Sequence, residues 1–202
     1  MEMKRVVILT AVLAILVFPA AALKSSLEVG VNLSYNNADE GLVKDGSVSG
    51  TSLLDRIAVG LEMRANISNF QMAITGDISI IDTQSILFSG VFSAGISADM
   101  FKYLKVGFTT GPKVSYLYSS SDKSVSGSDV NNGENFLDAL YKGHFHHRIM
   151  VDILAGPVMS IGAAYMVPTT FSLADGRLGN LLPKRDDLKK GQISVCISMK
   201  VF

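Results

Sequence analysis

The sequence predicts an all-β fold, an eight-stranded antiparallel up-and-down transmembrane β-barrel with a short helix in one loop. Three observations lead to this prediction. Eight stretches alternate apolar residues with small or polar ones, and a period of two places the two sets on opposite faces of a strand. An export signal precedes these stretches. The connections between them alternate between long and short, as in barrels with short turns at one end and long loops at the other.

The first 22 residues have the form of a cleavable secretory signal. Lys4 and Arg5 make the start basic, residues 6–18 are apolar, and residues 20–22 form an Ala-x-Ala cleavage site. The apolar run is shorter than the about 20 residues that a membrane-spanning helix needs. We therefore expect cleavage after Ala22, which leaves residues 23–202 as a single barrel domain.

The composition is apolar without long apolar runs. Hydrophobic residues make up 48% of the chain, yet no segment after the signal has the length and apolarity of a membrane helix. Apolar residues dispersed by alternation are typical of a membrane β-barrel. The formal net charge is +0, so nothing indicates nucleic acid or an acidic substrate as a partner. The only cysteine, Cys196, has no second cysteine with which to form a disulfide.

Four strands are predicted in the first half of the chain, at 27–35, 53–65, 70–80 and 86–100. The second alternates most clearly, because every odd position from Ile57 to Ala65 is apolar whereas Glu62 and Arg64 stand at even positions. Residues 36–52 are rich in Asn, Asp, Gly and Ser, which predicts a long loop. The connections that follow are shorter: a tight turn at 66–69, a modest turn at 82–85, and a turn at 101–102.

Four more strands are predicted at 103–118, 145–156, 161–171 and 191–202. Met150 and Leu154 interrupt the alternation of the sixth strand, and Pro168 in the seventh cannot donate to a ladder. The connections at 119–143 and 172–190 are long and polar.

A short helix is predicted in the first of these two loops. Residues 134–141 place four apolar residues at helical spacing. A helix in this loop could cap the mouth of the barrel.

The polar face of the strands is predicted to line the lumen. Gly, Ser, Ala and Thr dominate this face, whereas a water-facing exterior would carry dense Lys and Glu. The lumen of an eight-stranded barrel is only wide enough for side chains. The predicted lumen-lining ionisable residues are Glu28, Arg56, Glu62, Arg64, Asp77, Asp99, Lys105, Lys113, Arg148 and Asp152.

Two interpretations of this ionisable set stay open. The residues form a buried network of paired charges, because unpaired buried charge is costly, or they line a polar conduit or gate. We hypothesise that Glu62 and Arg64 pair across strands with Lys105 or Asp77.

Aromatic residues fall near the predicted strand ends, where membrane barrels carry two aromatic girdles. Three lie at the ends that enter long loops and three at the short turns. The predicted girdle residues are Tyr35, Tyr116 and Tyr118 at the first end, and Phe70, Phe101 and Tyr103 at the second.

The chain has one histidine cluster, formed by His144, His146 and His147. His144 and His146 share a face, but no Cys or carboxylate follows at a spacing that would complete a metal site, so a polar patch at the loop edge is favoured. No nucleophile motif accompanies His147, and no phosphate-binding loop or pair of catalytic carboxylates is found. We predict no enzymatic activity, no cofactor and no metal site.

The arrangement resembles the small eight-stranded outer-membrane barrels, the families of outer-membrane proteins W, X and A. The resemblance covers essentially all of the mature chain and is one of pattern. Phe202 matches the terminal aromatic that these proteins present to the barrel-assembly machinery, although Met199 and Val201 occupy the apolar face here and Phe202 is out of phase with them. The resemblance implies the outer membrane of a double-membraned bacterium, with contact to its lipid and with loops exposed outside.

Three functions are compatible with this pattern. The first is a narrow channel or carrier for small solutes, including hydrophobic ones as in the W family. The second is a structural or surface-interaction (adhesin-like) barrel, whose loops at 119–143 and 172–190 contact a host surface ligand or a neighbouring molecule. The third is a soluble periplasmic ligand-binding barrel.

Overall fold

The computed structural model describes residues 25–36, 57–80, 85–119, 124–126 and 136–202. The predicted signal at 1–22 and the lumen candidate Arg56 lie outside the described residues. The same holds for most of the predicted loop at 36–52 and for parts of those at 82–85 and 119–143.

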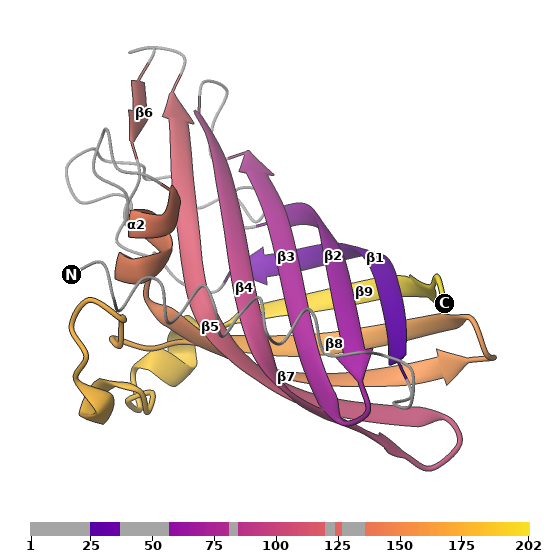
Figure 1. Cartoon of the computed structure of the whole chain (residues 1–202). Coiled ribbons are helices and arrows are strands. Elements are labelled where there is room, and N and C mark those ends of the chain that lie inside the picture. Colours follow the sequence, from indigo (N-terminus) through magenta and orange to yellow (C-terminus); the bar gives the residue numbers. More distant parts are fainter. Residues whose placement is uncertain (1–24, 37–56, 81–84, 120–123, 127–135) are drawn as a thin grey trace.

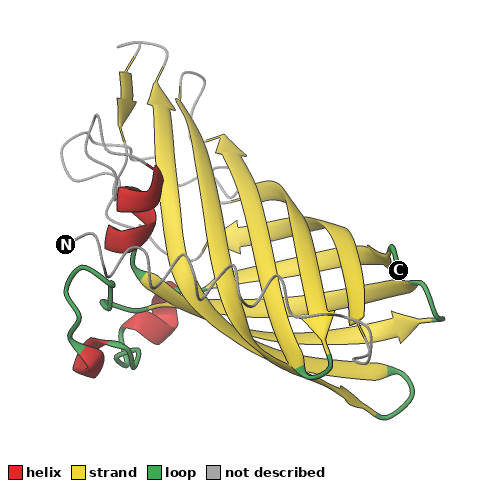
Figure 2. Ribbon diagram, viewed as in Figure 1, coloured by secondary structure: helices red, strands yellow, loops and turns green. Residues whose placement is uncertain are grey.

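Eight antiparallel strands close into a barrel (Figures 1 and 2). Each strand pairs with the next along the barrel, and β1 pairs with β9 to complete the circle. The predicted closed eight-stranded barrel with one short helix is therefore confirmed. The strands are β1 (Ser25–Asn36), β2 (Ile57–Ile67), β3 (Phe70–Ile80), β4 (Ser85–Met100), β5 (Leu104–Ser119), β7 (Phe145–Ala155), β8 (Met159–Pro168) and β9 (Gln192–Lys200).

Other elements lie in the connections. They are the short strand β6 (Ser124–Ser126), which pairs with the end of β5, the helix α2 (Phe136–Lys142), and the 3-10 turns η2 (Leu178–Asn180) and η3 (Asp187–Lys190). The strand β6 was not predicted. Among the described residues, no helix is long and apolar enough to cross a membrane.

Several strand boundaries differ from the prediction by one to three residues, among them those of β2 and β8. The strand β2 runs to Ile67, so Asn66 belongs to the strand and the turn consists of Ser68 and Asn69. The strand β8 ends at Pro168 rather than at 171, although Phe145 keeps backbone hydrogen bonds to Thr169 and Phe171 beyond it.

The rim of the barrel is oblique. The strands β4 and β5 each have 16 residues, whereas β9 has 9. Figure 1 shows β3, β4 and β5 rising beyond β7, β8 and β9 at the loop end. The ladder between β5 and β7 begins at Pro112 and Phe145, so the part of β5 beyond Pro112 has no partner in β7.

The helix α2 packs on the outer wall of the barrel, beside β5 (Figure 1). Ala139 is fully buried against Val114, with Tyr116 and Leu140 packed around them. The ring of Phe136 meets Phe92 of β4 edge-on, with 5.5 Å between the centroids. The expectation that this helix caps the mouth is wrong, because its apolar stripe pairs with the apolar outward face of the strands.

The two faces of the wall differ as the alternation predicts. In β2, Glu62 and Arg64 are each 1% exposed, whereas Leu61, next to Glu62, is 65% exposed. The same alternation runs through the other strands, so the outside of the barrel carries rows of exposed aliphatic side chains. These rows include Val29, Val31, Leu33, Val59, Met63, Ile149, Val151, Ile153, Ile193, Val195 and Ile197.

Candidate functional site: the polar interior and the cavity at the short-turn end

The middle of the lumen is crossed by an Arg–Glu pair between opposite walls. Arg148 of β7 donates two hydrogen bonds to the carboxylate of Glu62 on β2, at 2.6 and 2.8 Å. The parallel bonds match the planar guanidinium to both carboxylate oxygens. Both side chains are buried, so this pair fixes β2 and β7 relative to each other.

Arg64 of β2 connects several strands at once. Its guanidinium forms an ion pair with Asp152 of β7 and donates a hydrogen bond to the Ser198 hydroxyl of β9 at 2.8 Å. Its Nε lies 3.2 Å from Glu62 and 3.4 Å from Glu28 of β1. A single arginine therefore holds groups from four strands.

Lys105 extends this cluster toward the short turns. Its ammonium donates to Glu28 at 2.8 Å, and the amide of Asn66 donates to the same carboxylate at 3.1 Å. We call the six ionised residues the charge network. It pairs cations with anions in equal number, and its members are Glu28, Glu62, Arg64, Lys105, Arg148 and Asp152.

The hypothesised partners of Glu62 and Arg64 are wrong. Lys105 is bonded to Glu28, and Asp77 accepts a hydrogen bond at 2.9 Å from Gln192 of β9. Because strands in a closed barrel are tilted and staggered, side chains of β2 reach β7 across the lumen.

Three other predicted lumen residues do not belong to the charge network found among the described residues. Lys113 is buried on the inner face of β5, beyond the charge network toward the loop end. Asp99 is exposed at the rim near the short turn between β4 and β5, because it stands at the end of its strand. Arg56 lies outside the described residues.

Glycines on the inner face make room for the larger side chains. A Cβ on Gly107 would overlap the terminal methyl of Met150, and one on Gly162 would overlap Oδ1 of Asp152. Met150, which interrupts the alternation in the sequence, is 2% exposed and fills the lumen beside Arg64. The inner face is therefore matched in shape as well as in charge.

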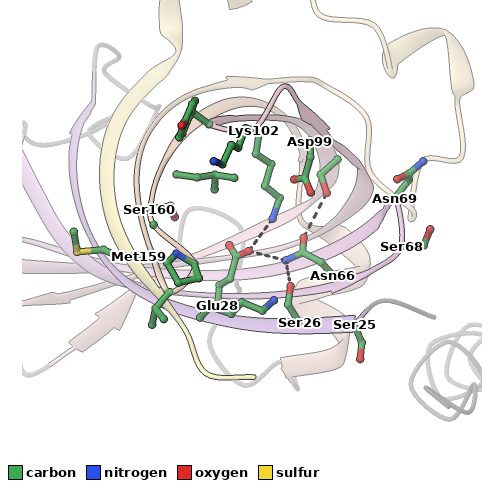
Figure 3. A pocket seen from close by; sticks show the side chains of 18 residues that line it. Ser25, Ser26, Glu28, Asn66, Ser68, Asn69, Asp99, Lys102, Met159 and Ser160 are labelled. Carbon is green, nitrogen blue, oxygen red and sulfur yellow. Dashed lines mark hydrogen bonds and ion pairs between the residues drawn. The ribbon is translucent and has the colours of Figure 1, made fainter. Parts of the chain in front are cut away.

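A polar cavity of about 460 Å³ opens at the short-turn end (Figure 3). All three short turns contribute to its lining through Ser68, Lys102 and Pro157. Glu28 and Lys105 of the charge network also line it, so the network forms its inner limit. Figure 3 shows Glu28, Asn66 and Ser26 connected by hydrogen bonds in its wall.

The side chains of the histidine cluster do not point toward a common site. The Nδ1 of His146 donates to the backbone oxygen of His144 at 3.1 Å, whereas His147 points outward and stacks on Phe108, with 5.6 Å between the ring centroids. Within the described part of the chain, no group of three His, Cys, Asp or Glu residues is placed to hold a metal ion.

Several buried polar residues of the lumen were not predicted as site residues. Gln71 of β3 is fully buried and donates to the Asn66 amide oxygen at 2.8 Å. Ser160 and Ser198 share a hydrogen bond of 2.6 Å. Their positions follow the same period-two rule as the charged residues, so counting every polar residue on the inner face would have found them.

Comparisons with known proteins give fold-level likenesses. No family model matches the chain, and no curated protein matches it. Among solved structures, the attachment invasion locus protein Ail of Yersinia pestis has 10% identity and a TM-score of 0.47, over 87% of this chain and 95% of that one. Ail in complex with the heparin analogue sucrose octasulfate gives 10% identity and 0.49, over 88% and 96%.

Neisserial surface protein A is also similar, with 12% identity and a TM-score of 0.44, over 88% of this chain and 96% of that one. At such identities and scores the likeness carries no argument about activity. The assignment of the barrel rests on the strand pairings of this chain.

Proposed function

We propose that the chain is an outer-membrane β-barrel with a closed interior, which acts as a structural or surface-interaction barrel through its loops. The observation that carries this proposal is the polarity of the two faces of the wall, which is the reverse of that in a water-soluble barrel. Charged side chains are buried inside, whereas aliphatic rows face outward, with Leu61 65% exposed. Rows of this extent are unfavourable in water and are stable against lipid chains.

The aromatic residues support the same orientation. Phe101 and Tyr103 are exposed at a short turn, and Tyr118 is exposed near the loop end of β5. These are the two heights at which aromatic side chains meet the headgroup regions of a bilayer. We propose that all six predicted girdle residues form the two aromatic belts. The other three are Tyr35, Phe70 and Tyr116.

The charge network favours the surface-interaction barrel over the channel. Solute passage would require Arg64 and Arg148 to leave partners such as Glu62 and Asp152, and breaking a buried ion pair costs about 3–5 kcal/mol. The polar cavity at the short-turn end stops at this network. The long loops are then the parts of the chain that are available to a partner outside the cell.

The seam between the first and last strands supports assembly as an outer-membrane protein. The backbone N–H of Val201 donates to the carbonyl of Leu27 at 2.7 Å, so the last residues continue the closing seam between β9 and β1. We propose that the barrel-assembly machinery recognises this C-terminal strand.

Conductance separates a closed barrel from a channel. Wild-type protein inserted in a planar bilayer is expected to pass no steady ion current, because the charge network fills the lumen. A matched variant with Glu62→Ser, Arg64→Ser, Arg148→Ser and Asp152→Ser removes the network and is expected to conduct. A steady current through the wild-type protein would contradict the closed interior.

Cysteine labelling tests the location and orientation. The native Cys196 is buried, so a membrane-impermeant maleimide has little background reaction. On intact cells we expect Gly179→Cys in the β8–β9 loop to be labelled and Lys102→Cys at a short turn to be protected until the membrane is opened. Equal labelling of both on intact cells would contradict the proposed orientation.

A further inference from the structure

The loop between β8 and β9 lies against the outer wall of the barrel. We call residues 169–191 the wall loop. The His147 ring, which points outward from β7, donates to the backbone oxygen of Leu181 at 2.7 Å. The Tyr165 hydroxyl, which points outward from β8, donates to the backbone oxygen of Leu188. Figure 1 shows η2 and η3 of this loop standing outside the strands.

The wall loop covers the top of an outward-facing row. Val167, which pairs with His147 in the ladder, is 5% exposed, whereas Ile161 lower in the same row of β8 is 44% exposed. The loop therefore sits where the exposed aliphatic wall ends at the loop end of the barrel. In the proposed orientation this is the level of the headgroups of the outer leaflet.

The exposed side chains of the wall loop are of two kinds. Leu178 and Leu182 are 74% and 76% exposed, without an apolar neighbour to cover them. Basic residues outnumber acidic ones between the two leucines and the start of β9. The basic residues are Arg177, Lys184, Arg185, Lys189 and Lys190, and the acidic ones are Asp186 and Asp187.

We propose that the wall loop is an interfacial anchor that binds the phosphate groups of anionic lipids in the outer leaflet. Leu178 and Leu182 enter the boundary of the acyl chains, while Lys184 and Arg185 contact the phosphates above them. Apolar side chains beside a cluster of Lys and Arg are the combination that binds an anionic membrane surface. Guanidinium and ammonium groups both donate hydrogen bonds to phosphate oxygens.

This inference rests on the proposed membrane location and adds a ligand to it. The choice of lipid over a protein partner follows from the position of the loop. Its backbone is held to the lipid-facing side of β7 and β8 by His147 and Tyr165, so its leucines stand next to the bilayer rather than above the mouth.

A tryptophan reporter tests the anchor, because the chain contains no native Trp. Leu182→Trp places a single reporter in the wall loop, and Ile161→Trp places one on the exposed wall below it. Each protein is inserted in vesicles of neutral phosphatidylcholine, or of phosphatidylcholine mixed with anionic phosphatidylglycerol, with brominated chains as quenchers. We expect Ile161→Trp to be quenched in both vesicles, and Leu182→Trp to be blue-shifted and quenched more in the anionic ones.

Charge variants then assign the lipid phosphate contact. Adding Lys184→Gln and Arg185→Gln to the Leu182→Trp protein is expected to abolish the difference between anionic and neutral vesicles. The matched variant Lys102→Gln, at the opposite end of the barrel, is expected to leave that difference unchanged.

The possible failures are distinguishable. An unquenched Ile161→Trp would overturn the membrane location itself. A quenched Ile161→Trp with a water-exposed Leu182→Trp would overturn only the anchor and leave the leucines to a protein partner. Equal quenching of Leu182→Trp in neutral and anionic vesicles would overturn the binding of anionic phosphates.

Discussion

The two faces of β2 meet opposite surroundings, and the contrast between them summarises how the molecule is built. Arg64 on the inner face is bonded to Asp152, Ser198 and Glu62. Leu61 on the outer face is 65% exposed and needs only an apolar surrounding. The inner face is specified by particular partners, whereas the outer face is specified by polarity alone. A substitution is therefore expected to act by different rules on the two faces.

The largest expected effect is on the inner face. Arg64→Ala leaves Asp152 and Glu62 with unbalanced buried charge, so the free energy of unfolding is expected to fall by about 3–5 kcal/mol. Urea unfolding of the protein in phospholipid vesicles measures this change. The outer-face control Leu61→Ala is expected to lose clearly less. A loss below about 1 kcal/mol for Arg64→Ala would mean that the charge network does not hold the strands together.

The outer face is tested by adding a charge rather than by removing one. In the proposed membrane location, Leu61→Arg places a guanidinium against the acyl chains and is expected to cost about 2–4 kcal/mol near the bilayer midplane. The same urea titration in vesicles measures it. A surface facing water would tolerate this charge within about 0.5 kcal/mol, so an unchanged midpoint would contradict the lipid-facing assignment.

A pair of glycine substitutions compares the faces by shape. Gly162→Ala brings a Cβ against Asp152 in the lumen and is expected to destabilise the barrel by about 1–3 kcal/mol. Gly76→Ala is the matched control, because a Cβ there meets no atom within 4 Å. Equal unfolding midpoints for the two variants would show that the interior is loosely packed at Gly162.

The smallest effect is expected at the rim of the cavity. Lys102 lies on an exposed turn, where charges are screened by water, so Lys102→Gln is expected to change stability by less than about 0.5 kcal/mol. Lys105→Gln, whose ammonium is bonded to Glu28, is expected to cost about 1–3 kcal/mol. If Lys102→Gln destabilised the barrel as much as Lys105→Gln, Lys102 would have to be counted as a member of the charge network.

The faces of the strands could be predicted from the sequence, because the direction of a side chain in a strand depends only on its position in the alternation. Glu62, Arg64, Arg148 and Asp152 follow this rule and are buried. The rule weakens at strand ends, which is why Asp99 is exposed at the rim. It also places Met150 on the inner face, but it gives no warning that Gly107 leaves room for this side chain.

The sequence by itself determined which residues alternate, where the strands lie and which connections are long, because these properties are set by neighbours along the chain. Only the tertiary structure decided that Arg148 pairs with Glu62 across the lumen and that Arg64 reaches Asp152. It also decided that α2 packs on Val114 and that the wall loop lies against β7 and β8. These contacts depend on the tilt and stagger that close the barrel, and closure joins strands that are far apart in the chain.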